Sequence, residues 1–252
     1  MKNKLSIIIV NCITMTRVIG TFILPIISKF TSPRTVIIYV GLLLLTDAID
    51  GMLARRLKAS TIFGSLLDAA ADKLLGIACL AVLAGKYPIM LLPILTETII
   101  TIINTMGAAK GTVAESSTLG KIKTWVLGIA TVCGFCAIYS DNILLALNSS
   151  TNIGNNLINF FELIQAHQGI IIANIASISV GAGLIVACDY QIKVRNDLKK
   201  ARESGFVIKE IKLKKGKDLM YALFSEEYYQ KTKKEPLIKK LGEKTNEKNN
   251  RK

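Results

Sequence analysis

Long apolar segments recur along this chain and are separated by short polar or basic turns. Several of them approach the roughly 20 residues that an α-helix needs to cross the hydrocarbon core of a bilayer. Apolar residues make up 51% of the 252 residues, and their clustering in long runs disfavours a soluble core. We therefore predict an all-α integral membrane protein with six transmembrane helices and a short N-terminal interfacial segment. The predicted interfacial segment is 1–12, and the predicted spans are 13–30, 35–54, 61–85, 89–106, 125–139 and 169–188.

Positive charge is distributed unevenly along the sequence. The net charge is +14, and most of it lies after Tyr190. We therefore predict a six-helix membrane domain at 1–190 and a basic cytoplasmic tail at 191–252. Such a tail either lies on an anionic lipid surface or is simply solvated. No RNA-binding pattern with interleaved aromatic residues is present, so we expect no nucleic-acid partner.

The Lys and Arg residues between the predicted spans lie mostly on one side of the membrane. Basic loops of membrane proteins face the cytoplasm. With six spans, this rule predicts a multi-pass protein of the cell (inner) membrane with both termini on the cytoplasmic side.

Four aspartates stand at the facing ends of the second and third predicted spans. Asp47 and Asp50 are three residues apart, and Asp68 and Asp72 are four apart, so each pair shares one face of a helix. Four converging carboxylates repel one another unless cations neutralise them, and hard divalent ions prefer oxygen ligands. Two such ions about 3.5–4 Å apart polarise a phosphoryl group. A carboxylate at the edge of the cluster can serve as general base.

Two other interpretations of the acidic cluster remain open at the level of sequence. The aspartates could form a cation or proton pathway, although such pathways more often place single acids on several spans near the midplane. They could instead pair with basic residues and anchor the helix ends. The cations closest in sequence are Arg55, Arg56, Lys58 and Lys73.

Small and basic residues are interleaved with the aspartates. Gly51 allows a phosphate or nucleotide to approach the backbone closely, and Ala54 is small on the same helical side. Arg55 can bind a phosphate through two parallel hydrogen bonds. Gly64, one turn before Asp68, leaves space between helices. The pattern indicates phosphoryl chemistry but does not by itself select CDP.

These residues resemble the signature of the CDP-alcohol phosphatidyltransferase family, D-x2-D-G-x2-A-R-x8-G-x3-D-x3-D, and all eight fixed positions are present. The resemblance implies a six-helix membrane fold, often a homodimer, with Mg²⁺ or Mn²⁺ in a two-metal site. It implies that Asp47, Asp50 and Asp68 hold the metals, with Asp72 also near them. Asp72 would remove the proton from the acceptor alcohol, and CMP would leave. The positions expected to bind the CDP-linked lipid are Asp50, Gly51, Ala54, Arg55 and Gly64.

Further stretches bear on the acceptor alcohol. Asn11, Thr14 and Arg17, at spacings of three, and the segment 120–124 are similar to stretches of bacterial phosphatidylglycerophosphate synthases, a branch of this family. Thr96 departs from that branch, where Arg is usual. The resemblance implies CDP-diacylglycerol as donor and glycerol 3-phosphate as acceptor. The candidates for binding the acceptor phosphate are Lys110, Lys121, Lys123 and Arg195.

Several functional alternatives remain beside this hypothesis. Another acceptor of the same family, namely phosphatidylglycerol, serine or an inositol phosphate, would use the same aspartates. A cation-coupled transporter is the alternative from a different class of protein. A catalytically silent family member is disfavoured because all four aspartates are intact.

Overall fold

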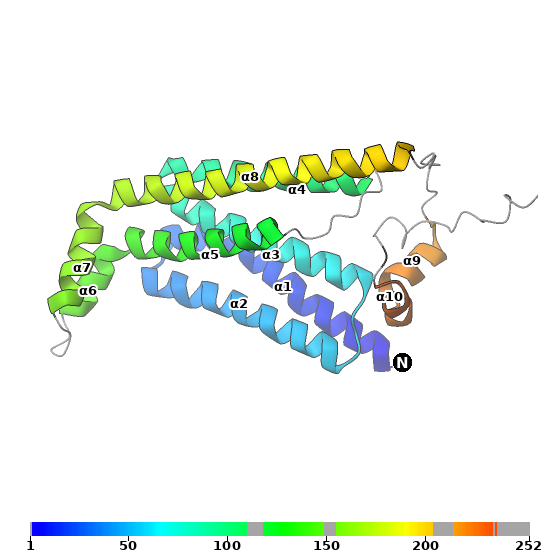
Figure 1. Cartoon of the computed structure of the whole chain (residues 1–252). Coiled ribbons are helices and arrows are strands. Elements are labelled where there is room, and N and C mark those ends of the chain that lie inside the picture. The colour runs from blue at the N-terminus through cyan, green and yellow to red at the C-terminus, as the bar shows by residue number, and fades with distance from the viewer. Residues whose placement is uncertain (1, 110–117, 149–154, 204–213, 234, 236–252) are drawn as a thin grey trace, which may run out of the picture.

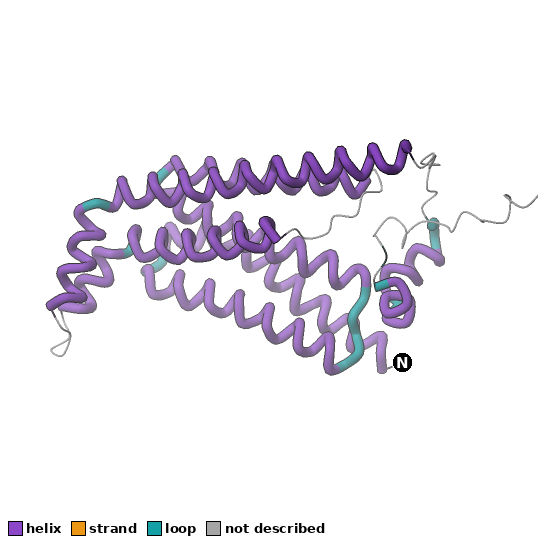
Figure 2. Tube along the Cα trace, in the orientation of Figure 1, coloured by secondary structure: helices purple, strands orange, loops and turns teal. Residues whose placement is uncertain are grey.

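The computed structural model of the 252-residue chain describes residues 2–109, 118–148, 155–203, 214–233 and 235. Within these residues the chain forms α-helices and one short 3₁₀ helix, without strands, which confirms the all-α prediction (Figure 2). The elements are α1 (Lys2–Phe30), α2 (Pro33–Arg56), α3 (Ile62–Lys86), η1 (Pro88–Met90), α4 (Leu91–Ala109), α5 (Thr118–Ile138), α6 (Ser140–Asn148), α7 (Asn155–Ala166), α8 (Gln168–Glu203), α9 (Lys217–Phe224) and α10 (Glu226–Thr232).

The helices confirm a multi-pass membrane protein, but they do not confirm the predicted count of six spans. α3 lies at the predicted third span and has 25 residues, yet it carries several charged side chains, including Asp68 and Asp72. It is therefore not among the described helices that are long and apolar enough to cross a membrane. Those five are Leu5–Phe30, Pro33–Arg56, Pro88–Met106, Thr118–Ile138 and Gln168–Asp197.

Several helix boundaries differ from the predicted ones. Residues 2–12, expected as a separate interfacial segment, are continuous with the first span, because no Gly or Pro interrupts α1 before Gly20. Residues 140–168, which lie between the fifth and sixth predicted spans, contain α6 and α7, and these two helices pack against each other. α8 runs through residue 190, where we predicted the membrane domain to end, and continues to Glu203.

The connection between α2 and α3 is short and held by local hydrogen bonds. The Ala59 N–H donates to the Ala54 carbonyl (2.9 Å), and Lys58 adopts a left-handed backbone conformation (φ 49°) where the chain reverses. The Thr61 side-chain oxygen then accepts from the Gly64 N–H (3.0 Å) and caps the start of α3. These contacts fix the start of α3 relative to the end of α2, and with it the two pairs of aspartates.

The main apolar core lies between α1, α2, α3, α5 and α8, and glycines allow some of these helices to approach closely. A Cβ atom added to Gly134 of α5 would lie 2.7 Å from Leu83 Cδ1 of α3. Similarly, a Cβ atom at Gly183 of α8 would lie 2.9 Å from Thr96 Oγ1 of α4. Tight contact of helix backbones through small residues is typical of membrane helix bundles.

The two ends of the bundle are built differently. α6 and α7 lie at one end, whereas α9, α10 and the N-terminus lie at the other (Figure 1). The α2–α3 connection belongs to the second end, so the tail helices lie near the acidic signature. We call this the signature end of the bundle.

Candidate active site

The four aspartates come from two helices that meet at the signature end. Asp47 and Asp50 lie in the last turns of α2, and Asp68 and Asp72 lie in the first turns of α3. One carboxylate oxygen from each of Asp47, Asp50 and Asp68 lies within 4.8 Å of the other two. The two acidic helix faces therefore converge, as their spacing indicates.

A buried arginine from α1 links these carboxylates. The Arg17 side chain is fully buried, and its guanidinium forms ion pairs with Asp47 and with Asp68, the latter at 2.8 Å from Nη2 to Oδ1. Asp72 Oδ1 lies 3.4 Å from the same nitrogen. Three residues earlier on the same face of α1, Thr14 donates a hydrogen bond to Asp50 Oδ2 (2.8 Å). The structure thus adds a third helix to the site.

The cations closest in sequence do not neutralise the cluster in the part of the chain that the structure describes. The ion pairs of the aspartates are formed by Arg17, whereas Lys73 donates to Thr101 Oγ1 (3.4 Å) on α4. The helix-anchoring alternative is therefore wrong about the pairing residues. One guanidinium faces four carboxylates, so the cluster keeps an excess of negative charge.

The donor set fits a hard divalent cation. Asp47, Asp50 and Asp68 offer carboxylate oxygens at mutual distances that one ion can bridge. Arg17 Nε is buried and has no hydrogen-bond partner among the described residues. The excess negative charge favours a bound cation, whereas the unpaired Nε–H group requires a hydrogen-bond acceptor.

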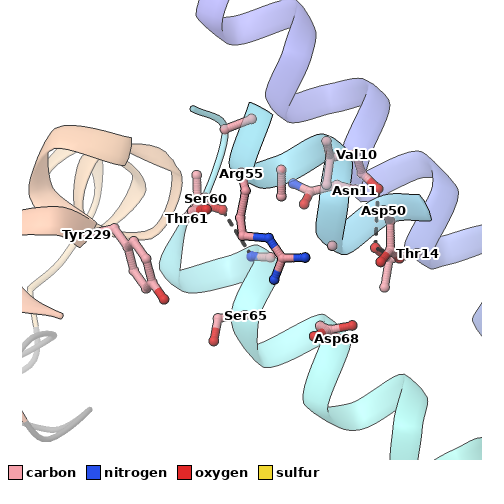
Figure 3. A pocket seen from close by; sticks show the side chains of 14 residues that line it. Val10, Asn11, Thr14, Asp50, Arg55, Ser60, Thr61, Ser65, Asp68 and Tyr229 are labelled. Atoms are coloured by element: carbon pink, nitrogen blue, oxygen red, sulfur yellow. Dashed lines mark hydrogen bonds between the residues drawn. The ribbon is translucent and has the colours of Figure 1, made fainter. Parts of the chain in front are cut away.

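A pocket of about 240 Å³ opens beside the aspartates. Figure 3 shows the guanidinium of Arg55 in this pocket, between Tyr229 on one side and Asp50 and Asp68 on the other. The hydroxyl-bearing residues Ser60, Thr61 and Ser65 also line the pocket. The signature positions that line the pocket are Asp50, Gly51, Ala54, Arg55, Gly64 and Asp68.

The two signature glycines have different surroundings. A Cβ atom at Gly64 would lie 3.0 Å from Asn11 Oδ1 and 3.1 Å from Thr61 Oγ1, so this glycine permits the close approach of α1 and α3. A Cβ atom at Gly51 would meet nothing within 4 Å. Since Gly51 lines the pocket, the open space beside it is available to a ligand.

The residues predicted to bind the acceptor phosphate are not brought together around this pocket. Lys121 on α5 and Arg195 on α8 are exposed, and neither lines the pocket. Lys123 is buried and donates to both carboxylate oxygens of Glu97 on α4, at 2.6 and 2.7 Å. Lys110 lies outside the described residues.

The sequence analysis did not place several residues of the site beside the aspartates. The polar residues Asn11, Thr14 and Arg17 recur every three positions in an apolar segment, and that periodicity could have assigned one face of α1 to the aspartates. Ser65 and Tyr229 also line the pocket. For Tyr229 no sequence pattern was available, because it lies far from the signature in a charged tail.

Comparison with known proteins agrees with this geometry. The family model described as CDP-alcohol phosphatidyltransferase matches residues 7–154, and the chain belongs to this family. A CDP-diacylglycerol–glycerol-3-phosphate 3-phosphatidyltransferase of Bacillus subtilis (strain 168) is 40% identical over 90 residues, covering 34% of this chain and 46% of the relative. The chain thus spans about half the length of the curated relative that it matches. No solved structure matches the chain.

Proposed function

We propose that the protein transfers a phosphatidyl group from CDP-diacylglycerol to glycerol 3-phosphate, giving phosphatidylglycerophosphate and CMP. The observation that carries this proposal is the convergence of signature aspartates beside a pocket lined by Gly51, Ala54, Arg55 and Gly64. Family membership supports phospholipid synthesis over a cation-coupled transporter. The named activity of the Bacillus subtilis relative supports this donor and this acceptor.

In this proposal, the aspartates divide the work of binding and proton transfer. Asp47, Asp50 and Asp68 would hold Mg²⁺ or Mn²⁺, with Asp72 close by. Bound divalent cations supply polarisation of the phosphoryl group and stabilise charge on both attacking and leaving oxygens. Asp72 accepts the proton of the acceptor hydroxyl, whose oxygen attacks the lipid-linked phosphorus as the bond to CMP breaks.

The remaining pocket residues bind the donor. Arg55 reaches into the pocket and is suited to two parallel hydrogen bonds with the pyrophosphate. The open space at Gly51 lets phosphate oxygens approach the backbone of α2. Arg17 holds the metal-binding carboxylates in position from within the bundle.

The membrane setting follows from the same proposal. The signature end would lie at the cytoplasmic face of the cell membrane, with α3 as a sixth span and both termini in the cytoplasm. CDP-diacylglycerol would then reach the site from the bilayer, and glycerol 3-phosphate from water. A homodimer in the membrane is part of this proposal on the strength of the family resemblance.

Recognition of the acceptor phosphate must use other groups than an arginine at position 96. Thr96 is buried and faces Gly183, so no room exists there for a long basic side chain. Lys123 is already paired with Glu97. Of the predicted candidates, Lys110, Lys121 and Arg195 are left as the proposed source of this charge, and Lys121 and Arg195 would act from outside the pocket, which neither of them lines.

An acceptor-specific assay tests the proposal directly. Membranes that contain the protein would be supplied with CDP-diacylglycerol, Mg²⁺ or Mn²⁺, and one radiolabelled acceptor at a time. We expect glycerol 3-phosphate to be incorporated into lipid with release of CMP. Incorporation of serine, phosphatidylglycerol or an inositol phosphate, but not of glycerol 3-phosphate, would overturn the acceptor assignment.

A further inference from the structure

The tail helices α9 and α10 pack at the signature end, outside the part of the chain that matches the family model. Ala222 of α9 is fully buried. The ring of Phe224 lies 4.9 Å, between centroids, from the ring of Phe63 at the start of α3. Phe224 also packs against the buried apolar cluster formed by Ile7 and Val10 of α1 and by Ala59. The end of α9 is therefore held by the two helices that supply Arg17 and Asp68.

The chain turns sharply after this anchor. Ser225 follows Phe224 in extended backbone conformation, and its side-chain oxygen accepts from the Tyr228 N–H (3.3 Å), which caps α10. α10 begins at once, so its first turns stay near the start of α3. Tyr229, in the second turn, is half-buried and lines the pocket.

The order of groups across the pocket matches the order of groups in a CDP-linked lipid. Figure 3 shows Asp50 and Asp68 on one side, the Arg55 guanidinium in the middle, and Tyr229 on the opposite side. In the donor, the pyrophosphate lies between the lipid and the cytidine. If the lipid-side phosphate, which is attacked, lies at the carboxylates and the nucleoside-side phosphate, which leaves with CMP, lies at Arg55, the cytidine extends toward Tyr229.

We propose that Tyr229 forms part of the nucleoside-binding wall and contacts the cytidine of the donor, so that the tail contributes a specificity residue to the site. The inference rests on the proposed function. An aromatic ring suits this role because every base offers a flat face on which a ring can stack. The hydroxyl groups of Ser60, Thr61 and Ser65, which line the same pocket, are suited to hydrogen bonds with the base edge or ribose.

The test measures binding of CMP to the purified full-length protein in detergent with Mg²⁺, by titration calorimetry. We expect Tyr229→Ala to weaken CMP binding about tenfold, the loss typical of one base–aromatic stack. Tyr229→Phe keeps the ring and should bind CMP within about threefold of the unsubstituted protein. With CDP-diacylglycerol as substrate, Tyr229→Ala should raise KM while kcat changes much less.

Tyr221→Ala is the matched control. Tyr221 is an exposed tyrosine on α9 that contacts the Tyr228 ring and does not line the pocket. It should bind CMP as the unsubstituted protein does. Phe224→Ala, which removes the anchor against Phe63, should weaken CMP binding as Tyr229→Ala does.

The outcomes separate the inference from the proposed function. Unchanged CMP affinity in Tyr229→Ala, or an equal loss in Tyr221→Ala, would overturn the assignment of Tyr229. A fall in kcat at unchanged KM would also overturn it. Equal losses in Tyr229→Ala and Tyr229→Phe would support contact through the hydroxyl group. Absence of CMP binding by the unsubstituted protein would instead count against the proposed function itself.

Discussion

Two groups of charged side chains in this bundle, each containing a buried cation, differ in their charge balance. In the first, Lys123 of α5 donates to both carboxylate oxygens of Glu97 on α4, and the two side chains are 10% and 18% exposed. In the second, Arg17 of α1 makes ion pairs with aspartates of α2 and α3. The first group holds one cation and one acid, whereas the second holds one cation and four acids.

The difference separates a structural contact from a binding site. A pair with equal and opposite charges needs no further ion, and it joins α4 to α5. Four carboxylates that share one guanidinium repel one another, and this excess of negative charge favours binding of cations from outside the chain. The pocket opens beside the unbalanced group, where Asp50 and Asp68 line it. Charge balance, rather than the number of ionised groups, thus marks the candidate active site.

The largest expected effect comes from neutralising one acid of the unbalanced group. Asp72→Asn should lower the rate of phosphatidyl transfer about 1,000-fold, since general base catalysis contributes roughly 10²–10⁴. The measurement is incorporation of radiolabelled glycerol 3-phosphate by membranes with equal protein content. Thermal unfolding in detergent should show that the variant folds. A variant with full activity would show that Asp72 is not the base.

Divalent cations should stabilise the protein through the unbalanced group and not through the balanced pair. Mg²⁺ or Mn²⁺ should raise the midpoint of thermal unfolding over that in EDTA, because an ion that binds only the folded state stabilises it. Asp68→Asn should abolish most of this shift, whereas Glu97→Gln should retain it. Transfer activity should be lost in EDTA and return with either ion. An equal shift in the Asp68→Asn and unsubstituted proteins would mean that the ion binds elsewhere.

The next largest expected effect is a loss of folding stability when Arg17, the cation of the unbalanced group, is removed. Arg17→Leu leaves its acids without a partner, and loss of one member of a buried ion pair costs about 3–5 kcal/mol. Because the Asp47 and Asp68 side chains are 41% and 50% exposed, we expect roughly the low end of that range, about 3 kcal/mol. Divalent cations should restore part of the loss, measured by unfolding with and without EDTA. If Arg17→Leu were as stable as the unsubstituted protein in EDTA, the excess negative charge would not be costly.

Breaking the balanced pair should have a smaller effect that a second substitution reverses. Lys123→Met leaves Glu97 unpaired and should cost about 2 kcal/mol. Adding Glu97→Leu should recover more than half of this, since an apolar replacement of both partners is often neutral. KM for glycerol 3-phosphate should be unchanged in the double variant. A large rise in KM at recovered stability would instead assign Lys123 to the acceptor phosphate.

The smallest effects on stability distinguish the two signature glycines. Gly64→Ala should cost about 1 kcal/mol, because its methyl group would press on Asn11 and Thr61 at 3.0–3.1 Å. Gly51→Ala should not lower stability, since nothing lies within 4 Å of its Cβ position and Ala favours a helix. The same Gly51→Ala change should weaken CMP binding, measured by calorimetry. Unchanged binding in Gly51→Ala would show that no ligand approaches α2 there.

Much of the helical fold and the core of the site could be predicted from local patterns. The run of apolar residues in 35–54 predicts a membrane-spanning helix, because backbone polar groups in lipid must be hydrogen-bonded within the segment itself. α2 covers this range. The spacing of Asp47 and Asp50, and of Asp68 and Asp72, assigns each pair to one helix face. Helix boundaries were less predictable. α6 and α7 form in a connection of mixed polarity, where contacts between helices decide.

The sequence by itself determined the family, five of the long apolar helices and the acidic signature, because each depends on residues close together in the chain. Only the tertiary structure decided which cation meets the aspartates, since Arg17 lies 30 residues before Asp47 and reaches it through helix packing. The same holds for the pairing of Lys123 with Glu97 and for the position of Tyr229 in the pocket wall. Periodicity specifies the face of one helix, but the partner across that face is chosen by packing and by charge neutralisation.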